Sequence, residues 1–253
     1  MRMNIIRLNR APVEIMRYLR SWGLDPKENN GVNAYLFAHI TIYQAMYLPK
    51  HFSEEDPAIL AQLISEYPLA TIVANLDGHF EINHLPLMLS ADKTKLYGHV
   101  ARMNPLTKVA SSSNTSVTAI FNGPNAYVTP AWYPSKKESG KVVPTWNYAA
   151  VHAEGSIKLI EDPQWLRAHV SKMTDIHEPT YQSTWKLDDA PEEYVQIMLK
   201  AIIGIEIDIK SLVGKFKLSQ NRPAQDYDAV VEQMKKSPRE ALQEILEYMR
   251  PPK

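Results

Sequence analysis

The sequence predicts an α+β protein that is mainly β, built on an antiparallel barrel or sandwich with helices at its margins. Many short segments have the composition of strands, and few helical segments separate them. This order is typical of antiparallel sheets, whereas regular alternation of strands and helices would indicate a parallel sheet. The 18 prolines also interrupt the chain often, because proline is poorly tolerated inside helices.

The first expected elements lie between residues 53 and 128. Ser53 can cap a helix whose first turn is acidic and which ends before Pro68. Asp77-Gly78 is a strong hairpin signal between two strands. A short helix opens at Asn104-Pro105, and Gly123-Pro124 is expected to turn the chain. The strands expected in this half are residues 69–75, 80–89, 95–101, 116–121 and 127–128.

Two helices are expected among the later strands. Asp162-Pro163 starts the first, since proline is favoured at the first helical position, and Pro191 starts the second. Four apolar residues of the second helix recur at helical spacing and are expected to face inward: Tyr194, Ile197, Met198 and Ala201. Further strands are expected at residues 155–160, 202–209 and 216–222, and helices end the chain after Asp226 and Ser237.

The composition is that of an ordinary globular protein. Apolar residues make up 45% of the 253 positions and charged residues 22%. Lys plus Arg equals Asp plus Glu, at 28 each, so no overall field attracts nucleic acid or a membrane. Cysteine is absent, which excludes disulfides, thiol nucleophiles and cysteine-ligated metals and fits a cytoplasmic protein.

Residues 1–45 differ from the rest of the chain. Five arginines make the start basic, and residues 29–49 then hold no Lys, Arg, Asp or Glu. Asn33, His39 and Gln44 interrupt this uncharged stretch, and a membrane span needs about 20 predominantly apolar residues. We therefore expect no membrane segment, and residues 1–45 to be an extension of a domain that begins near Met46. A regulatory arm is the alternative.

One stretch, residues 143–148, combines features that suit a ligand. A strand there would direct Trp146, Tyr148 and Ala150 to one face and Asn147 to the other. An amide beside a large indole suits a wall for a flat ligand. The alternative is a core strand whose tyrosine and tryptophan each find a polar partner.

Three polar clusters could carry chemistry: residues 99–105, 145–148 and 217–222. Arg102, Lys217 and Arg222 supply cations, and arginine suits bidentate phosphate binding. The side chains of Asn147 and Ser219 supply hydrogen-bonding groups. Taken together, the clusters fit a phosphorylated planar cofactor, although each could also be a solvated strand end or a helix cap.

Familiar catalytic and metal motifs are missing from the sequence. Neither glycine-rich phosphate loop, G-x-G-x-x-G or G-x-x-x-x-G-K-[ST], occurs. H-E-x-x-H and G-x-S-x-G are also absent. We therefore assign no metal ligands and no catalytic residues, and only His99 and His152 stand out as proton donors.

Four motifs resemble one known family in the same order along the chain: residues 46–52, 98–105, 143–148 and 217–221. They are similar to motifs of the PaiB-like family, described as FMN-binding negative transcriptional regulators. The resemblance covers residue 46 to the C-terminus. It implies a split β-barrel related to pyridoxamine-phosphate-oxidase-like flavoproteins, and a homodimer with FMN near the subunit interface.

The resemblance also implies contacts with FMN. Arg102 and a second cation are expected to hold the phosphate, and main-chain groups beside His84 and Ala101 to meet the polar edge of the ring. The expected cofactor-binding residues are His84, Leu85, Pro86, His99, Ala101, Arg102, Trp146, Asn147, Lys217, Ser219, Gln220, Asn221 and Arg222.

Domain organisation and function follow from the same resemblance. Residues 46–222 would form the split-barrel flavin-binding domain, and residues 223–253 a C-terminal helical extension packed on it. The implied function is negative transcriptional regulation by a homodimer, with DNA contacted directly or indirectly. A flavin-dependent oxidoreductase acting on a small molecule is the alternative, so enzymatic activity is left open, and a flavin store or structural dimer is the third possibility.

Overall fold

The computed structural model describes residues 46–112 and 115–251. The chain divides into two units, Met1–Tyr47 and Leu48–Lys253. All described helices and strands belong to the second unit, and the extension expected at residues 1–45 lies outside the described residues.

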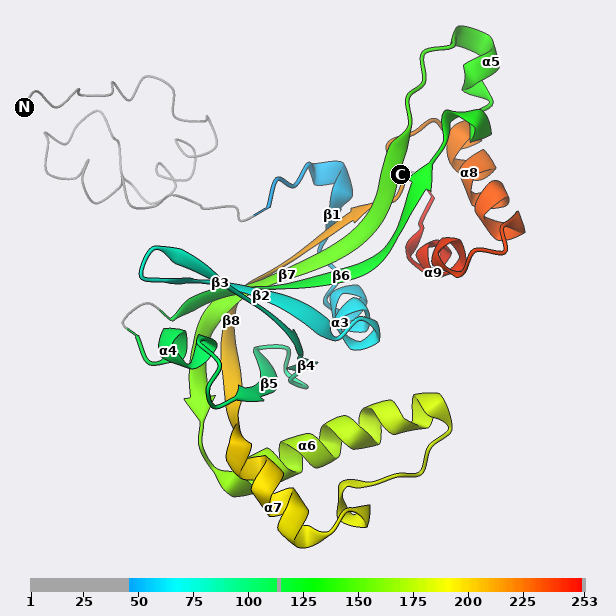
Figure 1. The fold of residues 1–253 in the computed structure, drawn as a ribbon. Helices are drawn as coiled ribbons and strands as arrows, with labels where there is room; N and C mark the ends of the chain where they lie inside the picture. The colour runs from blue at the N-terminus through cyan, green and yellow to red at the C-terminus, as the bar shows by residue number, and fades with distance from the viewer. Residues whose placement is uncertain (1–45, 113–114, 252–253) are drawn as a thin grey trace, which may run out of the picture. The chain divides into compact units, whose positions relative to one another are not determined.

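An eight-stranded antiparallel sheet forms the second unit (Figure 1), with strand order β3-β2-β6-β7-β8-β5-β4 and β1 beside β8. Among the described residues, no ladder joins β3 to β4, so the sheet does not close. The strands are β1 Ser53–Glu54, β2 Leu69–Leu76, β3 His79–Pro86, β4 Met88–Leu89, β5 Lys95–Ala101, β6 Ser116–Val128, β7 Thr145–Ile160 and β8 Ile202–Lys217. This is a split β-barrel, and the predicted mainly β class is confirmed.

Helices lie at the margins of the sheet, as predicted. They are α3 Pro57–Glu66, α4 Leu106–Ala110, α5 Ser135–Ser139, α6 Pro163–His177, α7 Glu192–Ala201, α8 Ala224–Lys236 and α9 Glu240–Tyr248. Helices α3, α4, α8 and α9 share one apolar core with the inner face of the sheet. None of these described helices has the length and apolar character that a membrane crossing requires.

The three longest strands were not fully predicted. The turn expected at Gly123-Pro124 is wrong, because β6 continues through it with a register shift between Asn122 and Asn125. A bulge of this kind absorbs residues that fit poorly in a ladder. In β7 a shift follows Glu154, and only glycine fits at Gly155, where an added Cβ would lie 2.2 Å from Asp208 O.

The predicted start of the first helix is wrong, whereas the predicted hairpin turn is confirmed. Ser53 does not cap α3 but belongs to β1, opposite Lys215 of β8. Asp56 caps the helix instead, accepting a hydrogen bond from Ala58 N at 2.8 Å. The hairpin signal is confirmed, because Asp77 and Gly78 both have positive φ, 51° and 85°, as a type I′ turn requires.

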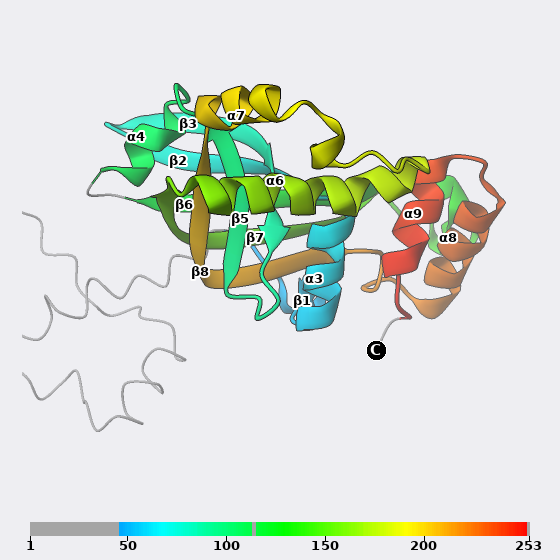
Figure 2. The ribbon, with the colours of Figure 1, turned by 90° about the horizontal axis from the view of Figure 1, so that it is seen from below.

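Helices α6 and α7 form a hairpin with a small apolar cluster of its own: Leu166, Leu187, Val195 and Leu199. Figure 2 shows α6 lying across β5 and β8. The face predicted for α7 is wrong, since Tyr194, Ile197 and Met198 are exposed. Val195 and Leu199 also recur at helical spacing, and this second stripe is the one that packs.

Candidate cofactor site

The predicted cofactor contacts fall into two groups, one around β3 and β5 and the other around the start of β7 and the end of β8. The first group lies on β3, on β5 and just after it: His84, Leu85, Pro86, His99, Ala101 and Arg102. The second lies at the start of β7 and the end of β8: Trp146, Asn147, Lys217, Ser219, Gln220, Asn221 and Arg222. Ala101 pairs with Ile202, whereas Tyr148 pairs with Lys217. About 50 Å of strand therefore separates Ala101 from Lys217, at roughly 3.3 Å per residue.

The first group surrounds the split of the barrel, where β3 and β5 approach without pairing. Gly98 allows this approach, because an added Cβ would lie 2.6 Å from Leu87 Cδ2 and 3.3 Å from Pro86 O. Asn104 then bridges the split by donating from Nδ2 to Asn83 Oδ1 at 2.7 Å. His84 stands exposed on β3, with Nδ1 3.1 Å from Thr71 Oγ1.

Arg102 is held by the last turn of α7. Its Nε donates to Lys200 O at 2.9 Å, and its main-chain N–H donates to Ala201 O at 3.0 Å. Its Nη1 lies 3.9 Å from a carboxylate oxygen of Glu161, and 41% of the side chain is exposed. The guanidinium is thus positioned by one main-chain carbonyl, Lys200 O, and remains accessible to an anion.

The side chain of His99 faces α6. Its ring lies 5.4 Å from that of His169, on which Trp165 stacks at 4.8 Å with an interplanar angle of 7°. His99 Nδ1 and His169 Nε2 are buried without a hydrogen-bond partner among the described residues. Burial lowers the pKa of both imidazoles, that of His169 to about 4, so both are neutral at physiological pH.

The second group presents aromatic rings and cations on one face. Trp146 is 53% exposed and meets the ring of Tyr127 edge-on at 6.1 Å. Tyr148 lies opposite Lys217 in the ladder, and Lys215 Nζ lies 5.8 Å from the Tyr148 ring centre. Lys217 Nζ donates to Thr145 Oγ1 at 2.7 Å. Sequence reasoning missed Tyr127 and Lys215, although alternation places Lys215 on the same face as Lys217.

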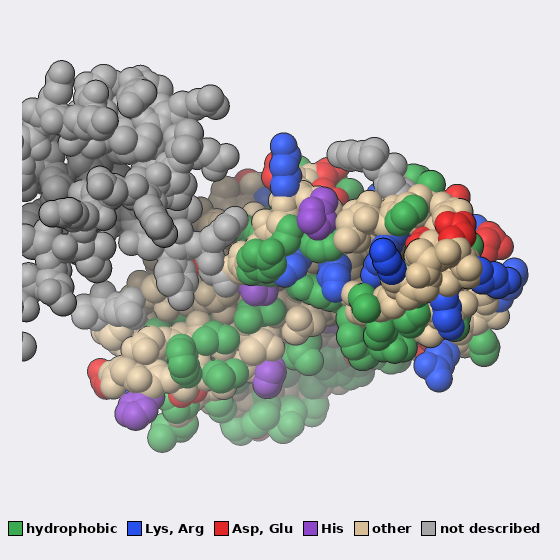
Figure 3. Space-filling model, turned by 90° about the horizontal axis from the view of Figure 1, so that it is seen from above, with side chains coloured by type: hydrophobic (Ala, Val, Ile, Leu, Met, Phe, Trp, Pro, Cys, Tyr) green, Lys and Arg blue, Asp and Glu red, His purple; other side chains and the backbone are tan. Residues whose placement is uncertain are grey.

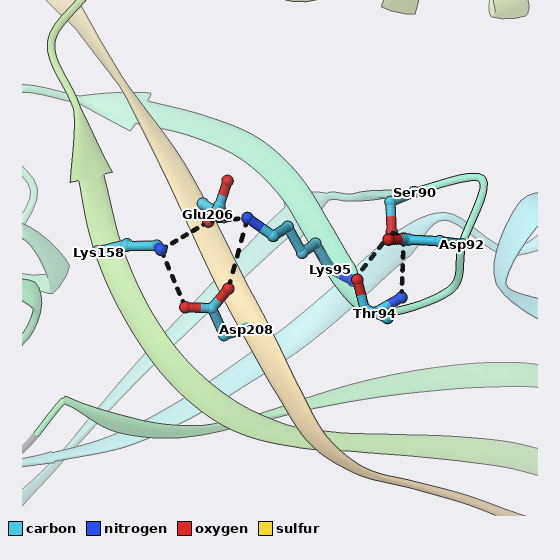
Figure 4. A network of polar contacts seen from close by, with 7 residues as sticks. All are labelled: Ser90, Asp92, Thr94, Lys95, Lys158, Glu206 and Asp208. Carbon is cyan, nitrogen blue, oxygen red and sulfur yellow. Dashed lines mark hydrogen bonds and ion pairs between the residues drawn. The ribbon is translucent and has the colours of Figure 1, made fainter.

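A charged network joins β5, β7 and β8 (Figure 4). Its carboxylates, Glu206 and Asp208, lie along β8 between Ile202 and Lys217. Lys95 and Lys158 each lie 2.8 Å from the same oxygen of Glu206, and Lys158 also lies 3.0 Å from Asp208. The lysines lower the pKa of Asp208, and hydrogen bonds to the carboxylates raise that of Lys158. These four charges compensate one another, so the network leaves no net charge for a ligand.

Residues 46–211 match the model of a family described as "Putative FMN-binding domain". The chain belongs to this family. The match includes three of the four motifs noted in the sequence, and the family description identifies the cofactor as FMN.

Two relatives agree with this membership. A protein of Emericella nidulans is 36% identical over 223 residues, covering 74% of this chain and 89% of its own length. The Bacillus subtilis protein named protease synthase and sporulation protein PAI 2 is 30% identical over 206 residues, covering 81% and 96%.

Two solved structures share the fold of this FMN-binding chain. The flavocytochrome Anf3 of Azotobacter vinelandii has a TM-score of 0.51 at 12% identity, covering 68% of this chain and 73% of its own. An FAD- and haem-binding protein of Mycobacterium smegmatis has a TM-score of 0.50 at 16% identity, covering 66% and 73%.

The accessible residues of both groups have chemistry that suits FMN. Arg102 at one end of β8 and Lys217 at the other are each able to form charge-assisted hydrogen bonds with a phosphate. The exposed rings of Trp146 and Tyr127 can pack against the flavin. FMN, when bound, supplies a ring that accepts and returns electrons.

Other predicted cofactor contacts make internal contacts around the end of β8 and the turn that follows it. Asn147 and Ser219 are buried, and Ser219 Oγ donates to Asn147 Oδ1 at 3.0 Å. Gln220 accepts from Leu218 N and donates to Phe216 O, and Arg222 stacks over the Tyr133 ring at 5.0 Å. We expect these side chains to act by fixing the positions of Lys217 and Trp146.

Proposed function

We propose that the protein is an FMN-binding negative regulator of transcription that acts as a homodimer, with each FMN held between two subunits. The observation that carries this proposal is the separation of Arg102 from Trp146 and Lys217 along β8. Each group offers a cation, but only the second offers exposed aromatic rings. We infer that neither group encloses a flavin alone.

A second copy supplies the missing half when the outer sheet faces meet. Most homodimers are twofold symmetric, so each surface contacts its own equivalent in the partner. In this arrangement a twofold axis near the middle of β7 and β8 relates the two copies by a rotation of 180°. Arg102 of one subunit then approaches the Trp146 and Lys217 end of the partner, and two equal FMN sites result.

The middle of the outer face supports this arrangement. Ladder pairing places His84, Thr71, Ile120, His152 and Val213 side by side across five strands. His152 Nδ1 is buried without a hydrogen-bond partner among the described residues, and burial followed by the charge of Lys215 lowers its pKa. Phe80 and Ile82 stand exposed beside this row. We expect an obligate interface on the order of 2,000 Å² or more.

A regulatory role is supported by the Bacillus subtilis relative, whose name refers to protease synthesis and sporulation. Direct reading of DNA by α8 is disfavoured, because Lys235 and Lys236 both pair with Glu232, at 3.5 and 4.0 Å. A recognition helix needs free basic and polar side chains. We therefore propose that the protein reaches DNA indirectly. We also propose that it acts in the cytoplasm, which its cysteine-free sequence fits.

Light scattering, FMN titration and transcript profiling test the proposal together. We expect a dimer mass at micromolar concentration and quenching of flavin fluorescence on binding. Deleting the gene should raise a set of transcripts that the parent protein, but not Arg102→Ala, lowers again. A monomer mass would contradict the dimer. Unchanged transcripts, with steady NADH or NADPH oxidation by the FMN-loaded protein, would support the oxidoreductase alternative.

A further inference from the structure

The hairpin end, residues 161–201, combines negative charge with an exposed apolar ridge. Eight Asp or Glu residues stand against four Lys or Arg residues in this segment. The α7 ridge consists of Tyr194, Ile197 and Met198, which are 55%, 60% and 44% exposed. Apolar residues at these helical spacings form a continuous stripe, and exposed stripes of this kind mark interaction surfaces.

The basic end, residues 127–148 and 215–222, has the opposite charge. Its charged residues are Lys136, Lys137, Glu138, Lys141, Lys215, Lys217 and Arg222. It also exposes apolar surface at Tyr127, Val143 and Trp146. Figure 3 shows lysine and arginine side chains gathered with hydrophobic ones over the part of the molecule that carries α5.

The two ends lie apart within one subunit. Figure 1 shows α5 and α7 at opposite ends of β7 and β8. The 16 residues of β8 lie between the hairpin end and the basic end, so a single chain cannot bring them together. Complementary charge steers association and fixes the register of an interface, which favours a second copy of this chain as the partner of each end.

The α7 ridge is also linked to Arg102, the proposed contact of the FMN phosphate. The last carbonyls of α7, on Lys200 and Ala201, bind the side chain and main chain of Arg102. A displacement of α7 therefore moves the guanidinium that is proposed to bind the phosphate. Affinity changes between two coupled sites are reciprocal.

We propose that the hairpin end of one subunit docks on the basic end of the second copy, and that this docking is linked to binding of the FMN phosphate through Arg102. The inference rests on the proposed homodimer with FMN between its subunits. It adds the contact surfaces and a regulation: FMN tightens the dimer, whereas riboflavin, which lacks the phosphate, does not.

Dilution series followed by analytical ultracentrifugation measure the linkage. We expect FMN to lower the dimer dissociation constant by about tenfold, since allosteric coupling commonly changes affinity by 5- to 150-fold, and riboflavin to leave it unchanged. In Arg102→Ala, FMN should lose this effect. Equal dissociation constants with FMN and riboflavin in the parent protein would overturn the linkage.

Ile197→Asp tests the docking surface. It should weaken the dimer and FMN binding by at least about tenfold, because apolar anchors at the centre of an interface contribute strongly. Gln196→Asp is the matched control, since it adds the same charge on the same helix beside the α7 ridge. If both variants dimerise and bind FMN like the parent, the docking is overturned while the proposed function stands. A monomeric parent would instead overturn the proposed function.

Charge reversal tests the complementarity of the two ends. Glu193→Lys and Lys137→Glu should each weaken the dimer by about two- to fivefold, as expected for exposed charges, and the double variant should recover part of the loss. If the double variant weakens the dimer as much as the two single effects combined, the pairing is contradicted. Loss of DNA binding in Lys137→Glu, with the dimer unchanged, would instead make the basic end a nucleic-acid surface.

The absence of cysteine from the chain allows a direct contact test. Subunits with Ile197→Cys are coexpressed with subunits with Val143→Cys and treated with a short bismaleimide. We expect mixed covalent dimers in high yield. Lys235→Cys, on α8, replaces Val143→Cys in the control. Equal yields in the two mixtures would overturn the proposed contact.

Discussion

The inner and outer faces of β7 have different surroundings, although they belong to one strand. On the inner face, Ala149, Val151 and Ala153 are buried in the core. On the outer face, Trp146 is exposed and His152 is only half-buried. The inner face therefore stabilises the fold, and the outer face is available to FMN and to a second subunit. Substitutions on the two faces should have separable effects.

The largest expected effect lies on the inner face. Phe121→Ala, at a fully buried position of β6, should lower the free energy of unfolding by about 3–5 kcal/mol, because it removes buried apolar surface and leaves a cavity. Urea denaturation measures this change. FMN affinity per folded molecule should stay the same, and a large loss would show that the two faces are not separable.

Arg102→Ala should have the next largest effect, on FMN rather than on the fold. A charge-assisted hydrogen bond contributes roughly 1.5–3 kcal/mol, so the affinity should fall by about ten- to a hundredfold. Riboflavin should bind the variant and the parent about equally weakly. Fluorescence quenching measures both ligands, with circular dichroism as the fold control. Parent-like FMN binding would return Arg102 to the role of a solvated strand end.

Trp146→Ala should weaken FMN and riboflavin alike, because the indole can act only on the ring or on the barrel. The expected loss is about 1–2 kcal/mol, as for an aromatic contact and its buried area. The same titrations compare the two flavins. A loss confined to FMN would instead indicate that Trp146 positions a phosphate contact.

Stability should also depend on pH through His169. Burial holds its folded-state pKa at about 4, against an ordinary value of 6.5. The unfolded chain therefore binds more protons, and the free energy of unfolding should fall as the pH drops from 6.5 towards 4. Thermal melts of the parent and of His169→Phe test this. If the melting temperature of the parent falls with pH no more steeply than that of His169→Phe, His169 is not the cause of the pH dependence.

The smallest expected effect concerns residues 1–45. A chain that starts at Met46 should fold, dimerise and bind FMN like the full chain, because the family match begins at Met46. Differential scanning calorimetry and FMN titration compare the two chains. Aggregation of the shorter chain, with loss of the thermal transition, would place residues 1–45 in the core.

Local sequence signals predicted much of the fold. The alternation of β7 and the Asp77-Gly78 turn are confirmed, because strand faces and tight turns depend on neighbouring residues. The buried face of α7 was predicted wrongly, since two apolar stripes share its helical spacing. The expected break at Gly123-Pro124 failed because a bulge, supported by tertiary pairing, accommodates these residues in β6.

The chemistry of the candidate site was easier to predict than its geometry. Arg102, Trp146 and Lys217 were identified by residue type and motif. Their separation follows from the register of β8, which pairs Ile202 with Ala101 and Lys217 with Tyr148. No local pattern encodes this long-range register, and the holding of Arg102 by α7 carbonyls depends on it as well.

Binding of FMN to a mixed dimer tests most directly whether two subunits build each site. Arg102→Ala and Trp146→Ala subunits, carrying different tags, are coexpressed and the mixed dimer is purified. With sites shared between subunits, a twofold dimer keeps one site intact, so it should bind about one FMN with parent-like affinity. Each variant alone should bind weakly. A mixed dimer that binds FMN only weakly at both sites would show that each site lies within one subunit.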